Sequence, residues 1–547
     1  MAPKYARTAI AIASIGIGLY SLLLARFAVH YGLFMDDMWF LQFSRTLQSV
    51  ILPQWNQDLV RPVPAFLFVI ANELGDFNLW GHIINAVVNA LTWLVSFAVL
   101  LDISWAHRPM RLRSIDWLFI SALSVSQLLH PSTGYNLLWV SGLQTLLGGL
   151  FFVLVVWSVI RFQRTKNWRW LVVLALSALL GFFSYEGALA LVVVVPVVYW
   201  YFDSDCRTKY GKYAIGSLLF PLLLYFSSRM LSGAQAVPET SVGKGMLTHW
   251  AEYLVVMING IDRSLFTYMV YVGGHLDIND WLTVIIFTAL PVICFYSLLA
   301  LGLLRNLRER RYKLVMVAFV LMLVAAIPVL VFRRAFVPRL AYMQVFSFML
   351  TLTIGYWASE KHSRYFFCAA LLLLFVQVHS FAELTNITEV VSTVRTEFAS
   401  SVVANTSVSS PKLIGLSPYS YRDFPVLVAT DDELAWRIGA HTRSSELGLY
   451  VLKNVRGPTE ISEAVACTQV GVDKFRYVVL SPWLYIKEKG AEDSGGYYIG
   501  QSVVEPGGFR YVILNVNRVG YITDFELSVP QNGRPTDCKY WQGKDSQ

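Results

Sequence analysis

Long apolar runs recur along residues 1–381, and they constrain the fold more than any other feature of the chain. Windows of about 19 residues give roughly eleven candidate spans. Only structures that satisfy their own backbone hydrogen bonds cross a bilayer, so runs of this length predict transmembrane helices. Hydrophobic residues make up 56% of the 547 residues and charged residues 15%, a balance that no single soluble core requires. The expected spans begin near Thr8, Trp80, Asp116, Asn136, Trp170, Ala188, Ala214, Trp281, Leu314, Leu340 and Tyr365.

The basic loops between these runs set the expected orientation. Lys and Arg accumulate on the cytoplasmic side of membrane proteins. The basic residues of the N-terminus and of loops 108–113, 161–169, 207–212 and 305–313 all fall on one side, which predicts a cytoplasmic N-terminus and an extracytoplasmic C-terminus. The first apolar run, residues 8–25, has no small-residue cleavage site after it, so we expect a retained span. The same loops explain the formal charge of +8 without a nucleic-acid partner.

The pattern changes after about residue 381, where hydropathy falls and short β-rich runs alternate with turn residues. We therefore expect a transmembrane domain over 1–381 and a soluble extracytoplasmic domain of α/β or α+β class over 382–547. Export of this domain would permit a disulfide between Cys467 and Cys538, and the alternative of two free thiols stays open. The expected strands cover 424–430, 475–481, 509–515 and 520–529, with a helix at 431–440.

An acidic pair, Asp36 and Asp37, follows the first span on the predicted outer face. The apolar spacing of residues 40–51 predicts an amphipathic helix on the membrane surface, with the pair at its N-terminal end. One carboxylate in this position fits a helix cap. A second at membrane depth is well placed as a general base for an incoming hydroxyl.

Basic residues also lie on the predicted outer face. Arg61 closes the loop that carries the acidic pair, and its alternative role is to reach lipid headgroups. Arg333, Arg334 and Arg339 crowd a short outer connection against the usual charge bias. Guanidinium forks match phosphate oxygens, so a lipid phosphate is their expected ligand, with nonspecific headgroup contact as the alternative.

Further candidates are expected to line a substrate cavity on the same face. Glu186 is a carboxylate between two apolar runs, which indicates either a functional group or a water-exposed turn. His130 stands at a helix end, where a hydrogen-bonded structural role is the common one. Trp139, Gln144 and Tyr342 complete the set.

In this order, the elements resemble the GT-C superfamily of integral membrane glycosyltransferases, above all its protein O-mannosyltransferase-like and bacterial envelope branches. They are the Asp36-Asp37 pair, Arg61-Pro62, His130-Pro131 with Trp139 to Gly142, Ser184 to Gly187, and Pro338 to Tyr342. The resemblance implies a polyprenyl-phosphate sugar donor, an acid of the first outer loop as catalytic base, and arginines on the donor phosphate. Where that family has a Lys-Glu pair this chain has Tyr185-Glu186, and it lacks tetratricopeptide repeats.

The expected function is sugar transfer from that donor to a glycan or other cell-envelope acceptor, such as lipopolysaccharide, at a bacterial inner membrane, with inversion at the anomeric carbon. Asp36 or Asp37 is the expected base, and no cofactor is expected. A divalent ion held by the two acids is the less favoured arrangement. The alternatives are a lipid-linked sugar flippase or transporter, and a glycan polymerase or ligase; the clustering of charges at one face disfavours transport.

Overall fold

The computed structural model describes helices up to residue 382 and strands from residue 420 onward. Asp36, Asp37, Arg333, Arg334, Arg339 and Cys538 lie outside the described residues, as do the segments expected to form helices at 40–51 and 431–440. The described helical ranges are 16–18, 20, 61–107, 112–202, 209–231, 290–324, 342–359, 361–378 and 381–382. The described strand ranges are 420–421, 424–425, 449–451, 465–471, 474–479, 486–488, 503–504, 510–516 and 522–528.

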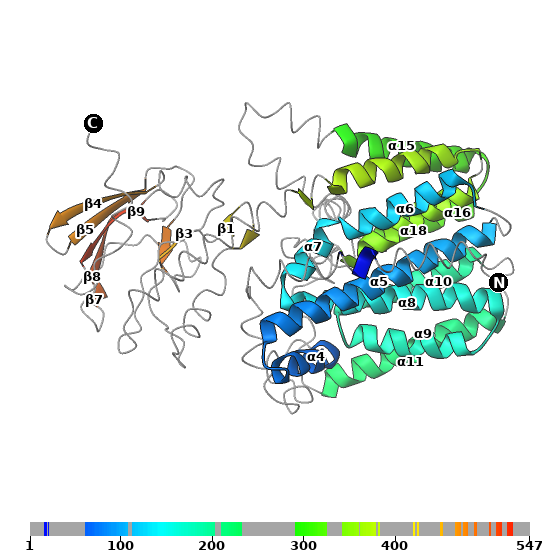
Figure 1. The fold of residues 1–547 in the computed structure, drawn as a ribbon, viewed down its shortest axis with the longest axis horizontal. Coiled ribbons are helices and arrows are strands. Elements are labelled where there is room, and N and C mark those ends of the chain that lie inside the picture. Colours follow the sequence, from blue (N-terminus) through cyan, green and yellow to red (C-terminus); the bar gives the residue numbers. More distant parts are fainter. Residues whose placement is uncertain are drawn as a thin grey trace, which may run out of the picture. The chain divides into compact units, whose positions relative to one another are not determined.

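The described helices occupy the positions of the spans predicted from Trp80 onward, whereas the total of eleven stays a prediction (Figure 1). Three of them are long and apolar enough to cross a membrane: Phe77–Trp105, Val140–Thr165 and Gly211–Leu231. The helices are α4 (Pro62–Glu73), α5 (Phe77–His107), α6 (Ser114–Leu128), α7 (Pro131–Leu138), α8 (Leu143–Thr165), α9 (Arg169–Phe182), α10 (Leu191–Phe202), α11 (Lys209–Leu231), α15 (Leu290–Arg308), α16 (Tyr312–Val324), α18 (Tyr342–Ala358) and a further helix at Ser363–Val378. Two 3₁₀ turns, η1 (Val140–Gly142) and η2 (Glu186–Ala190), precede α8 and α10.

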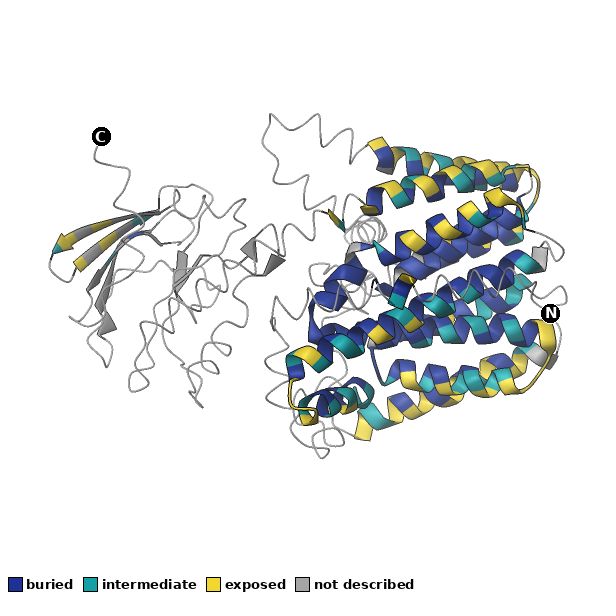
Figure 2. Cartoon of the chain, in the orientation of Figure 1, coloured by how far each residue is buried: buried dark blue, intermediate teal, exposed yellow. Residues whose placement is uncertain are grey.

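Helix α8 forms the centre of the bundle, in contact with α5, α9, α10 and α18. In its most apolar window 83% of the residues are buried, against 22% for α11. Figure 2 shows the exposed positions of α11 along its outer side, and they include Leu219, Phe220 and Leu223. Water would disfavour so large an apolar surface, whereas lipid solvates it.

A buried carboxylate joins α6 to α18. Asp116 is inaccessible to solvent and accepts a hydrogen bond from Tyr356 Oη at 2.8 Å and one from the backbone of Arg113 at 2.8 Å. The ring of Tyr356 also stacks on Phe119, with centroids 4.0 Å apart. These contacts satisfy a charge that burial would otherwise make very unfavourable.

The described strands belong to a second unit and pair antiparallel throughout, unlike the parallel strands of an α/β sheet. Strand β9 (Ile522–Ser528) lies between β5 (Lys474–Val479) and β8 (Arg510–Val516). Arg476 of β5 forms a two-point ion pair with Asp524 of β9, 3.1 and 2.5 Å long. The remaining strands are β1 (Ser420–Tyr421), β2 (Phe424–Pro425), β3 (Leu449–Val451), β4 (Val465–Gly471), β6 (Ile486–Glu488) and β7 (Val503–Val504).

Candidate functional site

A buried polar stripe runs along α5 and organises one end of the helical bundle. Five side chains spaced three or four residues apart share one face of the helix, and each is at most 2% exposed. Our interpretation of the sequence did not single them out, although polar residues at helical spacing within an apolar run are a recognisable pattern. They are His82, Asn85, Asn89, Thr92 and Ser96.

The N-terminal members of the stripe contact a broken helix. The span expected to start at Asn136 is interrupted: α7 ends at Leu138, Trp139 is extended, and α8 begins only at Leu143. The break releases backbone carbonyls that α5 satisfies. His82 Nδ1 donates to Leu137 O at 3.0 Å, and Asn85 Nδ2 donates to Trp139 O at 2.6 Å. Irregular backbone at membrane depth requires such partners. The span predicted to begin near Asn136 is present as Val140–Thr165, and the break lies at its start.

Replacement of Gly142 by Ala, at this break between α7 and α8, is expected to destabilise the folded protein. A Cβ at Gly142 would overlap the carbonyl group of Asn136, so the backbone must shift, and overpacking of this kind costs about 1–3 kcal/mol. The measurement is thermal unfolding of the full-length protein in detergent. The matched control is Gly216→Ala on α11, where nothing lies within 4 Å of the added Cβ. Equal melting temperatures for the two variants would contradict the expectation.

Two of the predicted cavity residues belong to the broken helix itself. His130 caps the N-terminus of α7, with Nδ1 accepting a hydrogen bond from Ser132 N at 3.1 Å. The ring of Trp139 is buried and lies edge-on to Tyr135, with centroids 4.6 Å apart. The structure therefore gives both residues a part in shaping this end of the bundle, and their contact with substrate stays a prediction.

Arg61 lies where three helix beginnings meet. It is the N-cap of α4, and its guanidinium donates to Oε1 of Gln144, the second residue of α8. The same guanidinium lies over the ring of Tyr185, 5.2 Å from the centroid, and Tyr185 is the N-cap of η2. These contacts hold one partly buried cation at the starts of α4 and α8, beside the ring of Tyr185.

Glycines let the neighbouring segments approach α8 closely. A Cβ at Gly148 would lie 2.9 Å from Cβ of Tyr185, and one at Gly149 would overlap the ring of Tyr342. The hydroxyl of Tyr342 donates to Oδ1 of Asn89 at 2.8 Å, which ties the start of α18 to the polar stripe. A side chain at Gly148 or Gly149 would force Tyr185 or Tyr342 to move away from α8.

The structure brings Arg61 to Gln144, and it places Tyr342 against Gly149 further along α8. Glu186 is adjacent in sequence to Tyr185 and begins η2. Cys467 lies on β4 opposite Tyr477, while its proposed disulfide partner lies outside the described residues. Across the part of the chain that the structure describes, no three His, Cys, Asp or Glu side chains are grouped as a metal site.

Long apolar helices and a lipid-compatible outer face define an integral membrane protein. No family model matches the sequence, and no curated protein matches it. Among solved structures, the chain is similar to ArnT from Cupriavidus metallidurans in the apo state, with 13% identity, a TM-score of 0.33, and coverage of 85% of this chain and 96% of that one. It is also similar to the same protein bound to undecaprenyl phosphate, with 13% identity, a TM-score of 0.31, and coverage of 84% and 96%.

Proposed function

We propose that the protein is an inverting glycosyltransferase of GT-C type that moves a sugar from a polyprenyl-phosphate donor to a glycan or other envelope acceptor on the extracytoplasmic side. The observation that carries the proposal is the position of Arg61 at the starts of α4 and α8, beside Gln144 and Tyr185. A guanidinium in such surroundings favours an anionic ligand. In a membrane-embedded site, the phosphate of a lipid carrier is an anion that arrives at the required depth.

The Tyr185-Glu186 element fits this assignment. The resemblance described above places a lysine where this chain has Tyr185. Here the guanidinium of Arg61 lies over the Tyr185 ring, so another element brings a cation to the same place. Arg333, Arg334 and Arg339 are the further proposed phosphate partners, and Arg339 precedes Tyr342 by three residues in the sequence.

The proposed chemistry needs one base and several cations. A carboxylate of Asp36 or Asp37 takes the proton of the acceptor hydroxyl while its oxygen attacks the anomeric carbon. The bond from that carbon to the phosphate oxygen breaks, and the polyprenyl phosphate leaves with the bonding electrons. Arginines stabilise the negative charge that gathers on the departing phosphate. A single displacement of this kind inverts the anomeric configuration.

The test is to incubate purified full-length protein with candidate polyprenyl-phosphate sugars and an envelope acceptor fraction, and to measure free polyprenyl phosphate and sugar-labelled acceptor. Transfer of single sugars with release of the lipid phosphate would support the proposal. Movement of the intact donor across vesicles without release would instead identify a flippase or transporter. Transfer of whole chains would identify a polymerase or ligase.

Treatment with a chelator is expected to leave the transfer rate unchanged. Several arginines balance the charge of a monophosphate leaving group, so the proposed reaction requires no divalent ion. The measurement is the initial rate with and without EDTA. Loss of activity that Mg²⁺ or Mn²⁺ restores would show instead that the acidic pair holds a metal.

A further inference from the structure

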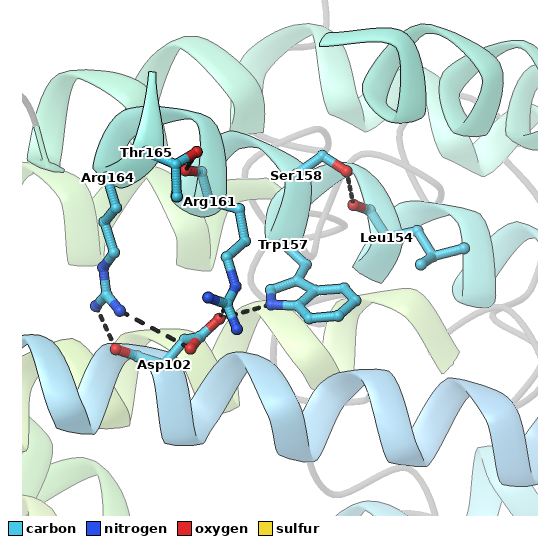
Figure 3. A network of polar contacts seen from close by, with 7 residues as sticks. All are labelled: Asp102, Leu154, Trp157, Ser158, Arg161, Arg164 and Thr165. Carbon is cyan, nitrogen blue, oxygen red and sulfur yellow. Dashed lines mark hydrogen bonds and ion pairs between the residues drawn. The ribbon is translucent and has the colours of Figure 1, made fainter. Parts of the chain in front are cut away.

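A second cationic cluster lies at the C-terminal end of α8, where two arginines meet one carboxylate of α5 (Figure 3). Asp102 is 3% exposed although it is charged. Its Oδ2 lies 2.6 Å from Arg161 Nε and accepts a hydrogen bond from Trp157 Nε1 at 2.7 Å. Arg164 lies 3.8 Å from the other carboxylate oxygen and donates to the backbone carbonyl of Asp102. The carboxylate therefore fixes the positions of both guanidiniums.

Two indole rings complete the arrangement around Arg161. Its guanidinium lies 5.6 Å from the ring of Trp157 on α8 and 6.0 Å from that of Trp170 on α9. Those rings meet edge to face, with centroids 5.4 Å apart. Stacking on an indole covers the face of a guanidinium and leaves its N–H groups, which lie in the guanidinium plane, available for hydrogen bonds.

The cluster lies at the other membrane boundary from Arg61. Gln144, which contacts Arg61, is separated from Arg164 by 20 residues of α8, since 164 − 144 = 20. At 1.5 Å per residue this is about 30 Å, the thickness of the hydrocarbon core. The basic loops predict that this end is cytoplasmic, which would put the two arginines at the depth of the inner-leaflet headgroups.

Positive charge exceeds negative charge at this end. The described residues of the cluster and of the turn between α8 and α9 include one acid, Asp102, and four cations, which are Arg161, Arg164, Lys166 and Arg169. Arg161 and Arg164 remain 35% and 28% exposed while they contact the carboxylate. Trp168, in the same turn, is 66% exposed, as is usual for an aromatic residue at a membrane interface.

We propose that Arg161 and Arg164 form a binding site for the phosphodiester headgroup of an anionic phospholipid in the inner leaflet. Asp102 neutralises one of the two charges and orients both side chains, the indoles support Arg161, and the remaining N–H groups bind phosphate oxygens. Lys166 and Arg169 add long-range attraction. This lipid would hold the inner ends of α5, α8 and α9 together, independently of the sugar-transfer site.

The test is native mass spectrometry of the full-length protein in non-ionic detergent during titration with phosphatidylglycerol. Arg164→Gln leaves the shorter pair of Asp102 with Arg161 intact and is expected to weaken lipid binding about fivefold, the effect of one interfacial cation. The matched control is Lys212→Gln, which removes an exposed charge from α11 and should leave the affinity within about twofold. Arg169→Gln, an exposed position without an ion pair to Asp102, serves as a second test should Arg164→Gln not fold.

The competing explanation is a purely structural ion pair. In that case Arg164→Gln and Arg169→Gln would bind phosphatidylglycerol as tightly as the Lys212→Gln control, and the proposal would be overturned. Inorganic phosphate that displaces the lipid at equal concentration would overturn it too, because the site would then recognise a free anion.

Discussion

Of the substitutions Asp36→Asn and Asp37→Asn, the one that removes the base is expected to slow sugar transfer at least about 100-fold. General-base catalysis contributes about 10²–10⁴ in rate. Amide replacement keeps the shape of the side chain and removes its proton-accepting charge. Asp36 is the first choice and Asp37 the second, with the other acid expected to orient the acceptor. The measurement is single-turnover transfer by the purified variants, singly and combined.

A measurement of donor binding distinguishes a variant that has lost its catalytic base from one that has failed to fold. The affinity of the variants for polyprenyl phosphate should stay close to that of the unaltered protein, because the proposed mechanism assigns the acids to the acceptor rather than to the phosphate. The matched control is Glu73→Gln, a change at an exposed carboxylate at the end of α4. Full transfer by both single variants and by the double variant would show that neither acid is the base.

Hydropathy located the helices because the free energy of burial in lipid depends on local composition. The expected starts at Trp170 and Leu314 lie within two residues of the observed starts of α9 and α16, Arg169 and Tyr312. The break at Trp139 was not predictable in this way. Its carbonyls are satisfied by His82 and Asn85, which lie more than fifty residues away in the sequence.

In the β-rich segment, too, the positions of elements were predictable from the sequence and their contacts were not. Residues 475–481 and 509–515 were expected to form strands, and β5 and β8 lie at those positions. Alternating apolar residues predict a strand but not its neighbour. The structure places the two runs on opposite sides of β9, where Tyr477 and Ile513 both pair with Phe525.

The candidate site was predictable as a set of residue types and not as a set of contacts. Arg61, Gln144 and Tyr342 were proposed from separate motifs on the predicted outer face. Asn89 was not singled out, and Tyr185 was noted only as part of the Tyr185-Glu186 pair, because both contact Tyr342 or Arg61 from far away in the sequence. The sequence does not show why Gly148 and Gly149 are glycines. The structure does, because Tyr185 and Tyr342 pack directly against them.

Replacement of Arg61 by Gln is expected to weaken binding of polyprenyl phosphate about tenfold to a hundredfold. Hydrogen bonds to charged groups contribute about 1.5–3 kcal/mol, and 1.4 kcal/mol corresponds to a tenfold change in affinity. Arg61→Lys keeps the charge but loses the planar fork and the stack on Tyr185, so its affinity should lie between those of the Gln variant and the unaltered protein.

The measurement is direct titration of polyprenyl phosphate into each purified variant, with thermal unfolding recorded in parallel. Arg308→Gln removes an exposed charge from the end of α15 and serves as the matched control. Because Gln144 and Tyr185 hold the guanidinium beside the start of α8, Gln144→Ala should also weaken binding, though less than Arg61→Gln. An Arg61→Gln protein that is folded and binds the lipid phosphate as tightly as the control would remove the observation on which the glycosyltransferase proposal rests. In that event the arginines between 333 and 339 would be the next residues to change, because they are the other cations expected on the same face.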